Sequence, residues 1–194
     1  MLRARLADKN EHWQKCTEFH ISTKVIAIVP PSYRCVPLCP TQVEVACKVG
    51  KPLFLHEREA HQDLVNVLEK FKDRLPPVIV HCFTGTEAEA EKYIEMGCYI
   101  GVTGFVCKAD RGRGVRQLLK QRTIPLAHLV IETDAPFMMP PLPSRDYGGL
   151  DPHGRTNEPC TLPLVVKSLA ELYNVSIEEV ADVTTANAMS LFQL

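Results

Sequence analysis

Short apolar runs alternate with amphipathic segments from residue 51 onward. The segment after the first run places Leu64, Leu68 and Phe71 at helical spacing. Apolar runs buried on both faces and alternating with helices are typical of a parallel α/β sheet. Each of the four apolar runs ends at, or one residue after, a side chain that can take part in catalysis or ligand binding. The runs are KPLFLH, PVIVH, CYIGVTG and HLVIETD, and the corresponding residues are His56, His81, Thr103 and Asp134.

The same pattern predicts the helices between and after these strands. We expect them over residues 58–71, 86–96, 114–122, 161–173 and 176–192. Thr84 or Thr86 can cap the second helix, and Gly97 lies just past its end. The segment after residue 134 is rich in proline and glycine and reads as a long loop.

The pattern is weaker before residue 51. The segment TKVIAIV (23–29) reads as another strand, and TQVEVACKVG (41–50) as the end of a helix. Residues 1–20 are polar and indicate no element beyond a short helix. The architecture is therefore best defined from residue 51 onward.

The carboxyl ends of the predicted strands suggest a site. In parallel α/β sheets and barrels, catalytic and ligand-binding groups lie at these ends. Two imidazoles and a carboxylate from His56, His81 and Asp134 would form the ligand set of a hydrolytic metal centre. The alternatives are a hydrogen-bonded loop role for each histidine and a turn or cap role for the aspartate.

Composition narrows the class of protein. The chain has 194 residues, 45% of them hydrophobic, which is enough for one domain with a sizeable core. Its 22 basic and 23 acidic side chains nearly cancel, so no global field attracts nucleic acid or membranes. The apolar runs are too short to span a bilayer, and the first residues lack a secretory signal.

The eight cysteines contain no C-x-x-C pair. We therefore expect a reduced, intracellular protein, either cytoplasmic or nuclear. Cys35 and Cys39 in CVPLC resemble half of a zinc site, but the sequence offers no second half.

Five motifs resemble those of the TatD-related DNases, metal-dependent hydrolases with an amidohydrolase-like (β/α)8 TIM barrel. They are HEREA (56–60), HCFTG (81–85), YIGVTG (99–104), IETDAP (131–136) and RTNEP (155–159), and they occur in family order. The resemblance implies a TatD-like metal-dependent hydrolase domain over residues 41–194. Residues 1–40 form an N-terminal segment that matches nothing in the family pattern.

The resemblance also implies residue roles. His56, His81 and Asp134 would bind a divalent metal ion (magnesium, manganese or zinc), and Asp134 would accept the proton of the attacking water. Arg58 would contact phosphate or support the site, unless it forms a surface ion pair with Glu59 or Asp63. Other motif residues would shape or buttress the site: Cys82, Phe83, Thr84, Gly85, Glu132, Arg155, Asn157 and Glu158.

The sequence departs from the family pattern in two places. The H-x-H of the first family strand and the G-E-x-G-L-D of the fourth are both absent. We therefore expect an incomplete barrel, with strands corresponding to five to eight plus one uncertain N-terminal strand, as in a truncated or alternatively spliced member. An open barrel edge would favour self-association.

The function that the resemblance implies is metal-dependent cleavage of phosphodiester bonds, with DNA as the substrate and no membrane partner. The alternatives are a catalytically impaired truncated paralogue or isoform acting as a binding module, and a hydrolase of another ester or amide. The basic stretch KADRGRGVRQLLKQR (108–122) would contact a nucleic-acid backbone, or else form a solvated helix face.

Overall fold

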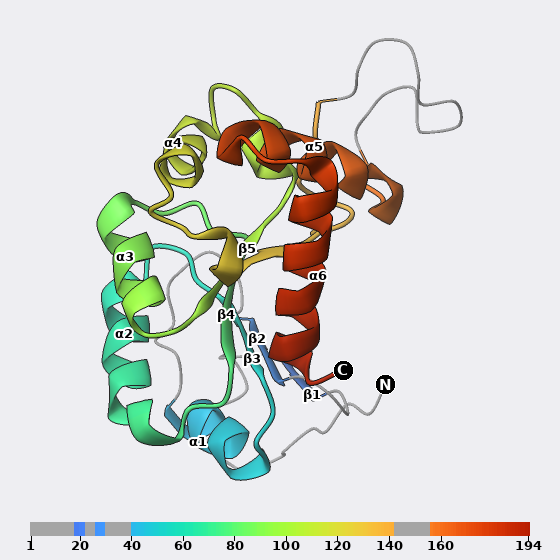
Figure 1. The fold of residues 1–194 in the computed structure, drawn as a ribbon. Coiled ribbons are helices and arrows are strands. Elements are labelled where there is room, and N and C mark those ends of the chain that lie inside the picture. Colours follow the sequence, from blue (N-terminus) through green and yellow to red (C-terminus); the bar gives the residue numbers. More distant parts are fainter. Residues whose placement is uncertain (1–17, 22–25, 30–39, 142–155) are drawn as a thin grey trace.

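The computed structural model describes residues 18–21, 26–29, 40–141 and 156–194. Six strands, six α-helices and four short 3-10 helices lie within these ranges (Figure 1). The strands are β1 (Glu18–Ile21), β2 (Ile26–Val29), β3 (Leu53–His56), β4 (Val78–His81), β5 (Tyr99–Val102) and β6 (Leu129–Ile131). The α-helices are α1 (Pro40–Val49), α2 (His61–Lys70), α3 (Glu87–Glu95), α4 (Arg113–Gln121), α5 (Leu162–Tyr173) and α6 (Ile177–Phe192). The 3-10 helices are η1 (Lys72–Arg74), η2 (Gly104–Cys107), η3 (Leu126–His128) and η4 (Pro159–Thr161).

The described strands form one sheet in chain order, β1-β2-β3-β4-β5-β6. Strands β2 to β6 run parallel, and β1 pairs antiparallel with β2. In the β3–β4 pairing, His56 lies opposite His81. The predicted parallel α/β sheet is thus confirmed, and the register brings two strand-end histidines to the same level.

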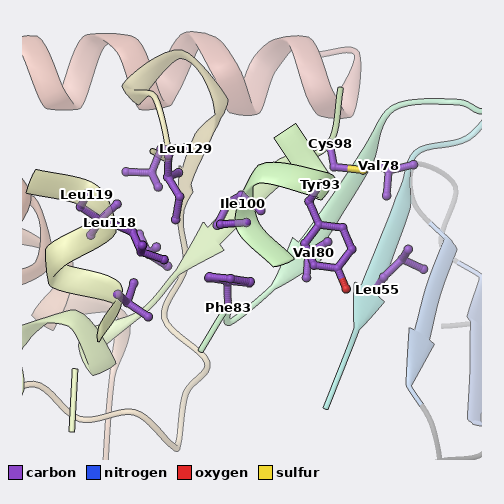
Figure 2. Close-up of a cluster of buried hydrophobic side chains, with 14 of the residues drawn as sticks. Leu55, Val78, Val80, Phe83, Tyr93, Cys98, Ile100, Leu118, Leu119 and Leu129 are labelled. Carbon is purple, nitrogen blue, oxygen red and sulfur yellow. The ribbon is translucent and has the colours of Figure 1, made fainter. Parts of the chain in front are cut away.

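One face of the sheet carries the main hydrophobic core. Alternate strand residues such as Leu55, Val80 and Ile100 point to this face and are almost fully buried. Helices α2 and α3 lie on this side in Figure 1, and Figure 2 shows Tyr93 of α3 among the strand side chains. Burying one such aliphatic side chain contributes about 1.5–3 kcal/mol to folding, so this face supplies much of the stability.

Helix α6 covers the opposite face of the sheet (Figure 1). Ile79 and Val130 of the sheet pack with Leu191 of α6 in a second, smaller cluster. The Asn187 amide donates hydrogen bonds to the carbonyl oxygens of Leu126 and Leu129, each 2.8 Å long. These bonds attach α6 to the beginning of β6.

The five helices predicted after residue 51 are all present, with small shifts at their ends. Thr86 caps α3: its hydroxyl accepts from the Glu89 amide, and the Glu89 carboxylate accepts from the Thr86 amide. Gly97 follows the helix with φ +74°. Glycine adopts this conformation at little cost, as expected at a helix end.

The predictions for the N-terminal part of the chain are confirmed only in part. The strand expected at 23–29 is confirmed as β2, and the helix ending near residue 50 as α1. Of residues 1–20, only 18–20 are described, and they belong to strand β1. The CVPLC pair lies outside the described residues. Among the residues that are described, no helix has the length and apolarity needed to cross a membrane.

Candidate metal centre

The chemistry-bearing residues gather at the carboxyl ends of four neighbouring strands. His56 and His81 are the last residues of β3 and β4 and lie side by side in the register. Thr103 follows β5 directly, and Asp134 lies shortly after β6. Because parallel strands end at a common edge of the sheet, residues distant in sequence meet there.

His81 is held between two carboxylates. Its Nδ1 lies 2.9 Å from Glu132 Oε2, and its Nε2 lies 3.2 Å from Asp134 Oδ1. Burial of the ring disfavours its charged form, but the hydrogen bond and charge of Glu132, with those of Asp134, outweigh that effect and raise the pKa of His81. A ring nitrogen that donates to a buried carboxylate leaves the other nitrogen in a fixed orientation.

Glu132 links three parts of the site. Its Oε2 also accepts a 3.0 Å hydrogen bond from the Cys82 amide, and the Glu132 amide donates to the Val102 carbonyl. Within the described residues, its buried Oε1 has no hydrogen-bond partner. The carboxylate lies over Gly101 of β5, where an added Cβ would overlap it. Glycine at this position therefore makes room for the side chain that orients His81.

Two site residues have left-handed backbone conformations that non-glycine residues rarely adopt. Cys82 has φ +48° and Asp134 has φ +54°. Each such residue costs about 1–3 kcal/mol, and such strain is concentrated at functional sites. The Asp134 carbonyl accepts from the Phe137 amide, which closes the turn that presents its side chain.

Among the described residues, His81, Cys82 and Asp134 form a group whose donor atoms all lie within 4.8 Å of one another. Cys82 Sγ also lies 3.4 Å from the Thr103 hydroxyl. Burial raises the pKa of the Cys82 thiol to about 11, although the Thr103 hydrogen bond opposes the shift. Nitrogen, sulfur and carboxylate oxygen are all ligands of divalent transition metals, so the residues present fit a metal ion.

His56 lies beside this group rather than within it. Its ring centroid is 5.7 Å from that of His81, and the residue is exposed. Burial, followed by the neighbouring His81, lowers the pKa of His56, which favours the neutral ring that metals bind. The structure thus brings His81 and Asp134 together and leaves His56 one strand away.

Arg58 is exposed and lies in the segment between β3 and α2. Its guanidinium is near enough to His56 to help lower the pKa of that ring. Arg58 is therefore at the rim of the site, where a charged ligand would approach.

The loop after β6 is tied to its neighbours through Asn157. The Asn157 amide nitrogens donate to Thr133 O (2.7 Å, from Nδ2) and Pro136 O (2.9 Å, from the backbone), and its Oδ1 accepts from the Thr161 hydroxyl (2.6 Å). This is the buttressing expected of the loop. Arg155 lies outside the described residues.

Some basic side chains of the stretch 108–122 form hydrogen bonds within the fold. Arg116 donates to the Val106 carbonyl and the Ser168 hydroxyl, and Arg122 to the Tyr173 carbonyl. Arg113 is highly exposed. Arg116 and Arg122 therefore have structural roles, and the predicted contact with nucleic acid would fall to other basic side chains of the stretch, such as Arg113.

From the sequence, Cys82 was expected on the floor of the site, whereas the approach of its sulfur to the donor atoms of His81 and Asp134 was not expected. The one available signal was its place directly after His81, at the end of a strand. The role of Gly101 was also missed, because it depends on a carboxylate that arrives from the next strand.

Residues 33–193 match the sequence profile of the TatD related DNase family. The chain is 40% identical over 153 residues to the 3'-5' ssDNA/RNA exonuclease TatD of Edwardsiella piscicida and 42% identical over 153 residues to that of Pantoea vagans. Each match covers 79% of this chain and 56% of the relative. The chain thus spans little more than half the length of these curated relatives.

Solved structures give the same result for the fold. The TatD homologue YJJV of Escherichia coli has a TM-score of 0.66 at 29% identity, covering 79% of this chain and 54% of that one. A TatD family hydrolase of Entamoeba histolytica has a TM-score of 0.67 at 25% identity, covering 78% and 54%. The sheet of this chain is therefore part of a TatD-type barrel fold, and the chain belongs to the TatD related DNase family.

Proposed function

We propose that this protein is a metal-dependent hydrolase that cleaves phosphodiester bonds in nucleic acid. The observation that carries the proposal is the position of His81, with one ring nitrogen on the Glu132 carboxylate and the other beside Asp134. A carboxylate–histidine pair of this kind orients a ligand towards a metal. Membership of the family and the names of the relatives support the choice of reaction.

In the proposed site, His81 and Asp134 hold a divalent ion, with His56 as a third ligand from the neighbouring strand. Magnesium, manganese and zinc are the candidates. Such an ion supplies Lewis-acid activation of water and of the phosphoryl oxygen. Glu132 acts as a positioning residue, because it fixes the tautomer and orientation of His81.

Asp134 is the proposed proton acceptor. As water oxygen forms its bond to phosphorus, a water proton passes to the Asp134 carboxylate, the bond from phosphorus to the leaving oxygen breaks, and that oxygen takes a proton from solvent. Asp134 is only partly buried, with 25% of its side chain exposed, so it can return the proton to solvent.

Arg58 is the proposed phosphate contact, since a guanidinium binds phosphate in a bidentate fashion. The relatives are named as 3'-5' exonucleases of single-stranded DNA and RNA, and we propose single-stranded DNA as the substrate, with RNA as the second choice. The exposed Arg113 on α4 would add sequence-independent contacts to the backbone.

The test is DNA cleavage by the purified chain with magnesium, manganese or zinc, each added separately. We expect metal-dependent degradation that Asp134→Asn reduces by several orders of magnitude. The matched control is Asp182→Asn, which alters an exposed carboxylate on α6. Equal degradation by the Asp134→Asn variant would exclude the proposed mechanism.

The second candidate is a catalytically impaired binding module. The absent H-x-H and G-E-x-G-L-D motifs favour it, because a two-metal site needs more ligands than these strands provide. Metal-independent binding of DNA without cleavage would support this candidate.

Self-association is a separate prediction. Among the described strands, β6 pairs only with β5, which leaves its other edge for a second copy. Light scattering at increasing concentration would detect such dimers. We also propose an intracellular location, in cytoplasm or nucleus, because the described cysteines (Cys47, Cys82, Cys98, Cys107 and Cys160) are free thiols.

A further inference from the structure

We infer that Cys82 is a direct ligand of the metal centre, so that His81, Cys82 and Asp134 form a nitrogen–sulfur–oxygen site that selects zinc-class ions over magnesium. The inference rests on the proposed function, because it concerns the same centre. It adds a ligand that the sequence analysis did not assign and a metal preference that the family resemblance left open.

The position of the sulfur is the first argument. The donor atoms of the three residues lie within 4.8 Å of one another, and His81 and Asp134 already approach to 3.2 Å. Ligand atoms around one zinc ion sit about 2.0–2.3 Å from it, so a small closure brings all three into contact with one ion. Two of the three, Cys82 and Asp134, reach this point only through left-handed backbone conformations.

The hydrogen bonds around the donors are the second argument. The Thr103 oxygen accepts from the Phe105 amide, and its hydroxyl lies 3.4 Å from Cys82 Sγ, where it can donate to a thiolate. Thr103 thus supports the sulfur as Glu132 supports the His81 ring. Orienting partners of this kind typically accompany metal ligands.

The Cys82 backbone is also fixed by the site. Its amide donates to the same Glu132 oxygen that contacts His81. One carboxylate therefore sets the positions of two adjacent ligands.

The donor set determines the metal. Thiolate is a soft ligand that suits zinc and cobalt, whereas magnesium prefers oxygen ligands in near-octahedral geometry. On binding, the thiol proton passes to solvent, and the thiolate and the Asp134 carboxylate together balance the two charges of the ion. With His56 as the fourth protein ligand, water would occupy a fifth position, a coordination number that catalytic zinc sites can reach.

The experiment is cobalt titration of the metal-free full chain, followed by absorption spectroscopy. Cobalt bound to thiolate gives a sulfur-to-metal charge-transfer band in the near ultraviolet, besides the visible bands of any cobalt site. We expect this band in the unmodified chain and its loss in Cys82→Ser. The matched controls are Cys160→Ser, at an exposed position, and Cys35→Ser/Cys39→Ser, which removes the CVPLC pair.

The affinity for zinc and the accessibility of the Cys82 thiol are measured in parallel. Cys82→Ser should weaken zinc binding by more than about tenfold, since even the loss of an orienting partner costs 10–100-fold, and should change magnesium binding little. In the unmodified chain, zinc but not magnesium should protect Cys82 from alkylation, as read by peptide mass spectrometry. This second measurement stays decisive if the variant folds poorly.

The outcomes separate the two proposals. Visible cobalt bands that depend on His81 but lack the near-ultraviolet band would overturn the role of Cys82 and leave the metal centre intact. A near-ultraviolet band that survives in Cys82→Ser would also overturn that role. Failure of cobalt, zinc, magnesium and manganese alike to bind would overturn the metal centre and, with it, the proposed function.

Discussion

The ends of β4 and β6 differ from the end of β3 in how firmly their side chains are held. His81 has a hydrogen-bonded carboxylate on one nitrogen and Asp134 on the other, and only 12% of its side chain is exposed. His56, by contrast, is exposed, and its ring centroid lies 5.7 Å from that of His81. The same residue type at the same sheet edge is therefore preorganised on one strand and exposed on the next.

This difference teaches that position at a strand end is not enough to make a ligand. What distinguishes His81 is Glu132, which reaches it across β5 above a glycine. Preorganisation of this kind lowers the entropic cost of binding. The firmly held end should dominate metal affinity, and the loosely held end should contribute less.

The largest effect is expected from Gly101→Ala. The new Cβ would overlap the Glu132 carboxylate, which must then leave His81 and the Cys82 amide. We expect a loss of about 1–3 kcal/mol in the free energy of unfolding from overpacking and a loss of metal affinity. Urea denaturation and calorimetric zinc titration would measure both.

The control for that change is Gly114→Ala in α4, where an added Cβ meets no atom within 4 Å. It should stabilise the chain by up to about 1 kcal/mol through helix propensity. In a Glu132→Ala background, Gly101→Ala should cost less than it does alone. An unchanged cost there would show that the glycine serves some purpose other than housing Glu132.

The next effect is that of Glu132→Gln, which keeps the shape of the side chain but removes its charge. We expect metal affinity to fall about 10–100-fold, as for other orienting partners, with the fold retained. Isothermal titration with zinc would measure the loss, and Glu91→Gln is the control at an exposed carboxylate of α3. Unchanged affinity would remove the reason for treating the β4 and β6 ends as preorganised.

His56→Ala should have a smaller effect on metal affinity, below about tenfold, which is the lower end of the loss from an orienting partner. The reason is that the ring must be ordered on binding, so its net contribution is reduced. The same titration would measure it. A loss larger than that of Glu132→Gln would reverse the comparison between the two ends of the sheet.

Arg58→Lys should have the smallest effect. The exposed guanidinium would lose bidentate phosphate contact but keep its charge, so KM for single-stranded DNA should rise roughly two- to fivefold, the equivalent of an exposed ion pair. Metal affinity should stay unchanged. Steady-state kinetics at several salt concentrations would test this, and a change in metal affinity would place Arg58 inside the centre.

The fold was largely predictable because its signals are local. The apolar runs that became β3 to β6 and the helical spacing that became α2 to α6 are properties of short segments. The strand β1 was missed because residues 1–20 show no clear alternation, and its pairing with β2 is a tertiary feature.

The site was predictable only in part. Their positions at strand ends selected His56, His81 and Asp134. The sequence could not show which of them is held most firmly, because that depends on the neighbours that each side chain contacts in the fold. The room that Gly101 gives to Glu132 and the approach of the Cys82 sulfur to His81 and Asp134 were missed for the same reason. A glycine in a strand and a cysteine after a histidine acquire meaning only when β4, β5 and β6 lie side by side.

The bonds from Asn187 to the beginning of β6 have a consequence for biosynthesis. The anchoring amide lies 58 residues after Leu129, so β6 leaves the ribosome well before the helix that fastens it is made. Until then, the nascent chain can pair β3, β4 and β5 but lacks the α6 support for the strand that precedes Asp134. Assembly of the sheet edge that carries His81 and Asp134 is therefore a late event of translation.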